Sequence, residues 1–174
     1  ISANLILIIV VARVMGTTVF GGFSYVLAFA TIAVALADLG TTAVLARGLA
    51  QHSDEERSAY LGNFLIMRLA LVTVVTIGAL AVALTGPSDL RHALLIAAIG
   101  IPFLASRFFE PIYQVYGQPW LSLWSNVVFG LAQVLLAATV WLYPELDLTR
   151  LTAGFVISNV AYTLVALGMM LRLL

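Results

Sequence analysis

Residues 20–47 read FGGFSYVLAFATIAVALADLGTTAVLAR. The stretch is long and apolar enough to cross a bilayer, because a helix needs roughly 20 apolar residues to span the hydrocarbon layer. Near its end, however, it carries Asp38, followed by Leu39, a glycine and two threonines, and it closes on Arg47. The stretch therefore predicts a transmembrane helix that holds a charge at membrane depth.

The whole chain shares this apolar character. Hydrophobic residues make up 63% of its 174 residues and charged residues only 9%, whereas about a quarter of a soluble domain is charged. A soluble fold of this size could not bury so much apolar surface, so we expect a polytopic membrane protein. The net charge of zero argues against a nucleic-acid partner, and the absence of cysteine excludes disulfides and thiolate metal sites.

Six apolar segments are separated by turn-forming residues, and the first reaches spanning length only in part. The segments are about 1–15, 20–48, 62–85, 91–116, 119–143 and 150–174. Only helices satisfy their backbone groups over such lengths in lipid. We therefore predict an all-α transmembrane helical bundle of about six spans in one domain, residues 1–174. Both ends are apolar, which indicates a fragment truncated at each end.

Aromatic residues mark the expected depth of the fifth segment. Trp120 opens it and Trp141 lies near its close, a rise of about 31 Å along a helix. Because indole rings favour the headgroup level, this spacing predicts two aromatic belts. Arginines lie on both sides of the segments, so the positive-inside rule gives no orientation.

The longest polar connection covers residues 51–60. Its Ser53 and Glu56 form a capping-box pattern, which predicts a short surface helix. A solvated connector explains this connection more simply than a binding role does.

Asp38 lies well inside the second segment. A charge at a helix centre costs roughly 2.5 to 3.5 kcal/mol on the insertion scale, and each large apolar residue returns only about 0.3 to 0.6. Asp38 should therefore face the bundle interior or water. Arg47 points to the opposite side of the helix, so Asp38 needs another partner or a wet cavity. Alternatively, the helix breaks here and the carboxylate caps a new turn; broken helices at membrane depth also line cavities.

The fourth segment holds a second charged cluster. Arg107 and Glu110 are three residues apart, share a helix face and could neutralise each other. Two charges still cost roughly 5 to 7 kcal/mol, about what the apolar residues of the segment return. We therefore expect the charged face to point inward. Pro102 and Pro111 each remove a backbone hydrogen bond and predict a kink, which suits a moving transport pathway.

Other polar residues carry weaker signals. Three arginines lie near segment ends and could simply reach the membrane surface: Arg13, Arg47 and Arg68. Interhelical hydrogen bonding explains three amides as well as ligand contact does: Asn126, Gln133 and Asn159.

Catalytic motifs are missing from the sequence. It has no phosphate-binding GxxxxGK[ST] loop, so the chain should not itself hydrolyse ATP. His52 and His92 lack metal-ligand spacing, and no nucleophile lies in a pattern with a base. We expect neither an enzyme nor a resident cofactor or metal, although a coupling Na⁺ or H⁺ stays open.

Four short motifs occur in order over residues 12–50. They are Arg13-Val14-Met15-Gly16, Phe20-Gly21 with Tyr25, Asp38-Leu39-Gly40, and Arg47. In this order and spacing they resemble the start of bacterial polysaccharide flippases. These are the O-antigen or Wzx-like translocases of the multidrug/oligosaccharidyl-lipid/polysaccharide exporter superfamily. The resemblance covers about a quarter of the chain.

The resemblance implies an architecture. Such proteins have two lobes of six or so helices with a cavity between them, so this chain would be most of the N-terminal lobe, without the C-terminal lobe. It implies the bacterial inner membrane, a cytoplasmic amino end and a cytoplasmic connection 48–61, with 86–90 and 144–149 facing outward. The implied partners are a lipid-linked oligosaccharide, membrane lipid and the missing lobe, with a polysaccharide polymerase and glycosyltransferases as further candidates.

The resemblance also implies a function. It is translocation of undecaprenyl-diphosphate-linked oligosaccharide by alternating access. A lipid diphosphate needs cationic partners, and guanidinium groups bind phosphate with paired donors, so the candidates are Arg13, Arg47, Arg68 and Arg107. Asp38 and Glu110 would hold these arginines or respond to a coupling ion. The alternatives are a cation-coupled multidrug exporter, a non-transporting scaffold subunit and a lipid II flippase.

Overall fold

The computed structural model describes residues 2–51 and 53–172, and every regular element in that part of the chain is a helix. The elements are α1 (Ser2–Val14), α2 (Gly16–Asp38), α3 (Thr41–Gln51), α4 (Asp54–Thr85), α5 (Arg91–Leu104), the 3₁₀ turn η1 (Ala105–Phe108), α6 (Phe109–Val115), α7 (Trp120–Leu142) and α8 (Leu148–Met170). This confirms the predicted all-α bundle.

Five stretches are long and apolar enough to cross a membrane. They are Gly16–Gln51, Glu56–Thr85, Arg91–Val115, Trp120–Leu142 and Leu148–Met170. The first apolar helix is shorter, Asn4–Val14, in line with the expectation that the first segment spans only in part. Large apolar side chains such as Ile66, Leu135 and Ile157 are exposed on the outer surface, where lipid chains rather than water would surround them in a membrane.

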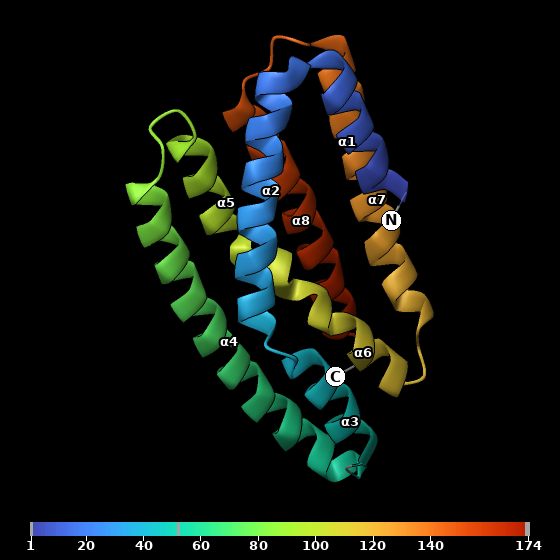
Figure 1. Ribbon diagram of the computed structural model, residues 1–174. Coiled ribbons are helices and arrows are strands. Elements are labelled where there is room, and N and C mark those ends of the chain that lie inside the picture. Colours follow the sequence, from blue (N-terminus) through green and yellow to red (C-terminus); the bar gives the residue numbers. More distant parts are fainter. Residues whose placement is uncertain (1, 52, 173–174) are drawn as a thin grey trace.

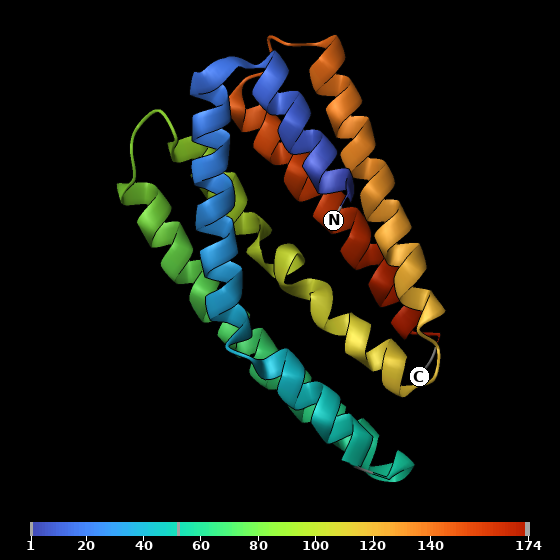
Figure 2. The same cartoon turned by 45° about the vertical axis from the view of Figure 1, so that its right-hand side comes forward.

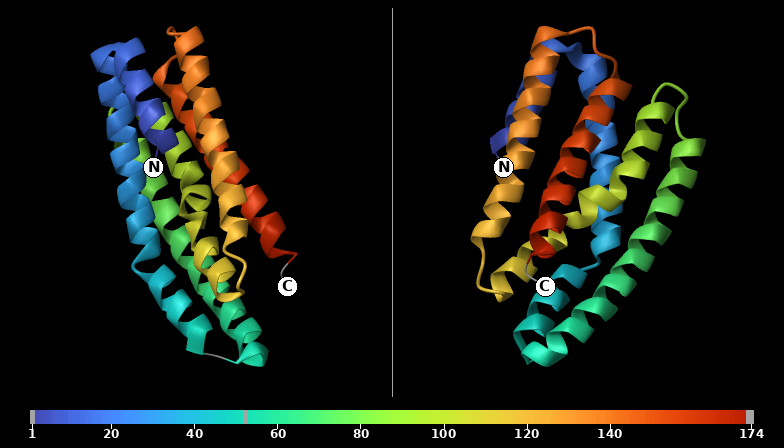
Figure 3. Two further views of the ribbon diagram at one scale, coloured as in Figure 1. Left: turned by 90° about the vertical axis from the view of Figure 1, so that its right-hand side faces the viewer. Right: turned by 180° about the vertical axis from the view of Figure 1, so that it is seen from behind.

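The helices pack around α8, which lies against both α5 and α7 (Figure 1). Helix α1 packs on α7, and α2 packs on α4 and α5. Figure 2 shows α3 and the start of α4 projecting together beyond the other helices. Seen from behind, the segment formed by α5 and α6 crosses the bundle obliquely (Figure 3).

The connections agree with the expected topology. The α4–α5 and α7–α8 loops lie at one end of the bundle, and the α3–α4 connection lies at the other (Figure 1). Residues 86–90 and 144–149 thus share a side, opposite 48–61. Which side faces the cytoplasm stays a prediction.

The long polar connection differs in part from its prediction. The backbone N–H and hydroxyl of Ser53 donate to Glu56 Oε2 at 3.2 and 2.9 Å, which confirms the capping box. The helix that follows is not a short surface helix, however, but the start of α4, which runs unbroken for 32 residues. No proline interrupts residues 54–85, so the capped turn continues directly into the span.

Two of the spans are broken. Between α2 and α3, Leu39 and Gly40 adopt φ angles of 41° and 77°, in the left-handed region. Between α5 and α6, the chain narrows into η1, three residues after Pro102, whose ring nitrogen carries no N–H for the helix. The structure therefore confirms both the predicted break after Asp38 and the predicted kink.

Replacing Gly40 with alanine is expected to lower the free energy of unfolding by about 1–2 kcal/mol, because a left-handed backbone costs this much once a Cβ is present. Space is not the cause, since a Cβ at Gly40 would meet no atom within 4 Å. Unfolding of the full-length protein in mixed micelles measures the change.

The matched control is Gly62→Ala in α4, where a Cβ also has open space but the backbone is helical. This control should be neutral or stabilise by up to about 1 kcal/mol. Equal losses at the two glycines would contradict the assigned role of the left-handed turn.

Candidate functional site

The first ionic contact lies where α2 ends. Arg68 of α4 places its Nη1 2.8 Å from Asp38 Oδ1. The same nitrogen donates to the Ala37 carbonyl at 2.8 Å and to the Thr41 hydroxyl at 2.7 Å. Its Nη2 donates to the Ala105 carbonyl at 3.1 Å. The partner that Asp38 requires is thus supplied by the neighbouring helix.

The ion pair between Arg68 and Asp38 is largely buried. The Arg68 side chain is 4% exposed and that of Asp38 32%. The guanidinium carbon of Arg68 also lies 5.5 Å from the centre of the Phe108 ring. Asp38 accepts a further hydrogen bond from the hydroxyl of Thr42, in the first turn of α3. The expected link between this carboxylate and a new helical turn is therefore present, through a side chain.

The second cluster lies on η1 and α6. Arg107 Nη1 is 3.6 Å from Glu110 Oε1 and 3.5 Å from Asn126 Oδ1. Glu110 Oε1 also accepts from the Tyr162 hydroxyl at 3.2 Å and from Asn126 Nδ2 at 3.4 Å. The guanidinium of Arg107 lies 5.1 and 5.2 Å from the ring centres of Phe129 and Tyr162, within cation–π range.

The two clusters differ in tightness. Contacts around Arg107 are long, and its side chain is 49% exposed. Contacts around Arg68 are short, and that side chain is buried. Arg107 can therefore exchange its partners for a ligand at lower cost, because less hydrogen bonding and burial would be lost.

Both clusters line one open cavity of about 280 Å³ between α2, α4 and the α5–α6 break. Four of the charged residues singled out in the sequence meet there: Asp38, Arg68, Arg107 and Glu110. Chemically, such a cavity offers two guanidinium groups whose charge is balanced by two carboxylates. It can bind an anion if the anion displaces one of these carboxylates from its guanidinium.

The remaining predicted arginines lie elsewhere. Arg13 ends α1 and Arg47 lies on α3; both are exposed, and neither lines this cavity. Exposure agrees with the interpretation that they reach toward the membrane surface. His52 lies outside the described residues, and His92 is exposed at the start of α5.

The three amides have different surroundings. Asn126 of α7 bridges to Arg107 and Glu110, as interhelical hydrogen bonding predicts. Asn159 instead donates within its own helix, to the Phe155 carbonyl at 2.9 Å. Gln133 is fully buried, and neither atom of its amide has a hydrogen-bond partner in the described part of the chain.

Replacing Gln133 with leucine is expected to raise the free energy of unfolding by about 1–3 kcal/mol, because the substitution removes a buried amide that forms no hydrogen bond. The control is Gln114→Leu on the exposed side of α6, expected to change stability by less than about 0.5 kcal/mol. Thermal unfolding of the full-length protein in detergent provides the comparison. A loss of stability in Gln133→Leu would mean that the amide has a partner after all.

Three members of the site were not predicted from the sequence. Tyr162 and Phe129 hold the guanidinium of Arg107, and Thr42 binds Asp38. Tyr162 follows Asn159 on the sixth apolar segment. Its position three residues from that amide, on an otherwise apolar helix, was the available signal.

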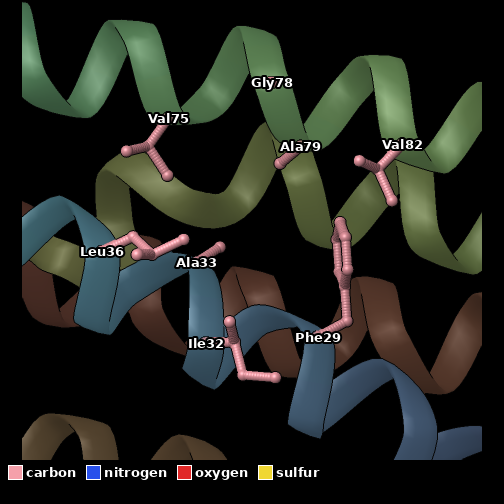
Figure 4. Close-up of a pocket in the computed structure, with 8 residues that line it drawn as sticks. All are labelled: Phe29, Ile32, Ala33, Leu36, Val75, Gly78, Ala79 and Val82. Atoms are coloured by element: carbon pink, nitrogen blue, oxygen red, sulfur yellow. The ribbon is translucent and has the colours of Figure 1, made fainter.

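An apolar groove of about 370 Å³ lies between α2 and α4 (Figure 4). Its lining consists of Phe29, Ile32, Ala33, Leu36, Val75, Gly78, Ala79 and Val82. On α2 the groove residues follow one face, whereas Val34 and Asp38, which line the ionic cavity, lie on another. The groove is therefore separate from the ionic cavity.

The fold and the cavity define a class of protein. Several apolar spans surround two ion pairs that open into a shared cavity, an arrangement typical of polytopic membrane transporters rather than of enzymes. Over residues 2–173 the chain matches the family described as polysaccharide biosynthesis protein, and it belongs to that family. No curated protein and no solved structure matches it.

Family membership gives the coarse function. The chain is a multi-pass membrane protein with a role in export or flipping related to polysaccharide biosynthesis. This agrees with the resemblance at the level of polysaccharide flippases.

Proposed function

We propose that the full-length protein translocates a lipid-diphosphate-linked oligosaccharide across the bacterial inner membrane. The observation that carries the proposal is the half-exposed guanidinium of Arg107, held over two aromatic rings at the edge of the ionic cavity. A planar guanidinium fixed in this way presents paired donors to phosphate oxygens. Family membership supports the glycan part of the substrate.

Charge balance in the cavity supports a reversible anion site. The Arg107 guanidinium is neutralised by Glu110 only through a contact of 3.6 Å. An arriving diphosphate competes with this carboxylate for the same guanidinium, so binding and release stay close in free energy. A transport site needs such a balance, because tight binding would prevent release on the far side.

The same contacts argue against Asp38 or Glu110 as a cation-coupling site. Each carboxylate already lies within 4 Å of a guanidinium, and that positive charge repels a coupling Na⁺. We therefore favour the glycan flippase over a cation-coupled multidrug exporter of the same superfamily. In alternating access, a second lobe of the kind that the resemblance implies would close the open side of the cavity.

The direct test is deletion of the gene in the source organism. A flippase predicts loss of surface polysaccharide together with accumulation of its lipid-linked precursor in the cytoplasmic leaflet. Accelerated flipping of that precursor in vesicles that contain the purified full-length protein would support the same conclusion. Loss of polysaccharide without precursor accumulation would indicate a scaffold role and overturn the proposal.

Replacing Glu110 with glutamine is expected to tighten the binding of inorganic diphosphate up to about fivefold, because a half-exposed ion pair contributes up to about 1 kcal/mol. Glutamine keeps an acceptor for the Tyr162 hydroxyl but removes the competing charge. Isothermal titration of the full-length protein with diphosphate measures the affinity. The control is Glu145→Gln, exposed in the α7–α8 loop; weaker binding in Glu110→Gln would contradict competition.

A further inference from the structure

A single side chain contacts both helix breaks. The first break separates α2 from α3 at Leu39 and Gly40, and the second is η1 between α5 and α6. Arg68 lies near the middle of α4, which passes both breaks without interruption. Its Nη1 binds the chain at the first break and its Nη2 binds the chain at the second.

The acceptors on both sides are carbonyl groups at the C-terminal ends of α2 and α5. Ala37 belongs to the last turn of α2, and Ala105 caps the C-terminus of α5. Carbonyls at the C-terminal end of an α-helix carry the negative end of the helix dipole and accept further hydrogen bonds readily. In a membrane they need a donor from elsewhere in the protein. The guanidinium of Arg68 supplies it to two helices at once.

Arginine is required for this geometry. Its guanidinium is a rigid planar group with five N–H donors pointing in different directions, whereas a lysine ammonium is a compact point charge. Arg68 uses its two terminal nitrogens: Nη1 donates to the Ala37 carbonyl and also contacts Asp38 and Thr41, whereas Nη2 donates to the Ala105 carbonyl.

Helices α3 and α6, which follow the two breaks, also contact each other. Leu45 and Leu49 of α3 belong to the same hydrophobic cluster as Phe109 and Ile112 of α6. A change of tilt at one break therefore disturbs the other. The contact between Arg68 and both breaks fixes the tilt of this pair relative to α4.

We propose that Arg68 is a positioning residue that fastens both helix breaks to α4 and sets the common tilt of α3 and α6, and that it is not itself a ligand of the transported anion. The proposal rests on the proposed function only in taking the ionic cavity as the binding site of the transported anion. An anion that took the terminal nitrogens of Arg68 as its ligands would have to break hydrogen bonds of 2.7–3.1 Å to both breaks, and the remaining donor, the Nε–H, is buried.

The tilt can be measured with spin labels across each break in the full-length protein in nanodiscs. Ala28 and Ala50 flank the first break, and Ile99 and Gln114 flank the second; all four are exposed. These 174 residues contain no cysteine, so engineered cysteines label selectively within this part of the chain. Pulsed electron paramagnetic resonance then gives one distance distribution for each break.

Arg68→Met is expected to broaden both distributions. Asp38→Asn should leave both close to those of the unmodified protein, because the contacts to the two carbonyls remain. If Arg68→Met does not reach the membrane, Arg68→Lys serves instead and should broaden both distributions to a smaller extent. Unchanged distributions, or broadening at one break alone, would overturn the proposal. The measurement needs no substrate, so it stands even if the glycan flippase assignment fails.

A kinetic comparison separates positioning from ligand binding. In a flipping assay, Arg68→Lys is expected to lower the maximal rate and to leave the half-saturating substrate concentration within about twofold. Arg107→Lys is expected to raise that concentration, because the lost donors face the anion. A rise in the half-saturating concentration for Arg68→Lys as large as that for Arg107→Lys would make Arg68 a ligand and overturn the proposal.

Discussion

Replacing Arg68 with methionine is expected to lower the free energy of unfolding by about 3–5 kcal/mol, the usual cost of removing one partner from a buried ion pair. Methionine fills much of the same space, so the loss reports on polar contacts more than on a cavity. The carboxylate of Asp38 and the carbonyls of Ala37 and Ala105 would all lose a donor at membrane depth. Denaturation of the full-length protein in mixed micelles measures the loss.

A double-mutant cycle divides this loss between the carboxylate and the carbonyls. Asp38→Asn removes the charge of the partner, so Arg68→Met should cost less in that background, by an interaction energy of about 0.5–3 kcal/mol. The control Arg91→Met, exposed at the start of α5, should change stability by less than about 0.5 kcal/mol. If Arg68→Met costs no more than Arg91→Met, the guanidinium is not structural.

The pairing of Asp38 with Arg68 could have been predicted from the sequence. The two residues lie fifteen positions before and after Ser53, respectively, and Ser53 starts the return helix. On neighbouring antiparallel helices, equal distances from the turn mean equal depth. The structure confirms that Asp38 needs a partner other than Arg47, the arginine on its own segment.

The burial of Arg68 depends on which face of α4 turns toward α2, and this face was not established from the sequence. From its place near a segment end, the sequence predicts that Arg68 could reach the membrane surface. The structure buries it because it shares a helix face with Val72, Val75 and Ala79, which pack toward α2. Small and β-branched residues at intervals of three and four already marked that face as a helix contact.

Other features depended on contacts between distant parts of the chain. The apolar segments, the break after Asp38 and the kink near Pro102 follow from local composition and turn chemistry, and the sequence predicted them. The bond between Glu110 and Tyr162 joins residues 52 positions apart, and its existence depends on how α6 and α8 cross. No local pattern specifies that crossing, so the aromatic surroundings of Arg107 could not be predicted.

Replacing Arg107 with alanine is expected to slow glycan flipping by about 10- to 100-fold, since a hydrogen bond to a charged group contributes roughly 1.5–3 kcal/mol. The fold should survive, because the side chain is half-exposed and its polar contacts are 3.5 Å or longer. Arg107→Lys should lie between alanine and the unmodified protein, since lysine keeps the charge but loses the planar stacking on Phe129 and Tyr162.

Vesicles that contain the full-length protein and its lipid-linked oligosaccharide provide the rate, and protein recovered per vesicle corrects for differences in insertion. The control is Arg150→Ala, whose side chain is 76% exposed and pairs with Asp147, three positions before it, at 3.9 Å. This control removes the same charge at the end of the bundle, away from the cavity. If both variants slow flipping equally, net charge of the membrane surface governs the rate. A specific loss in Arg107→Ala instead requires that the diphosphate meets this guanidinium on its way across.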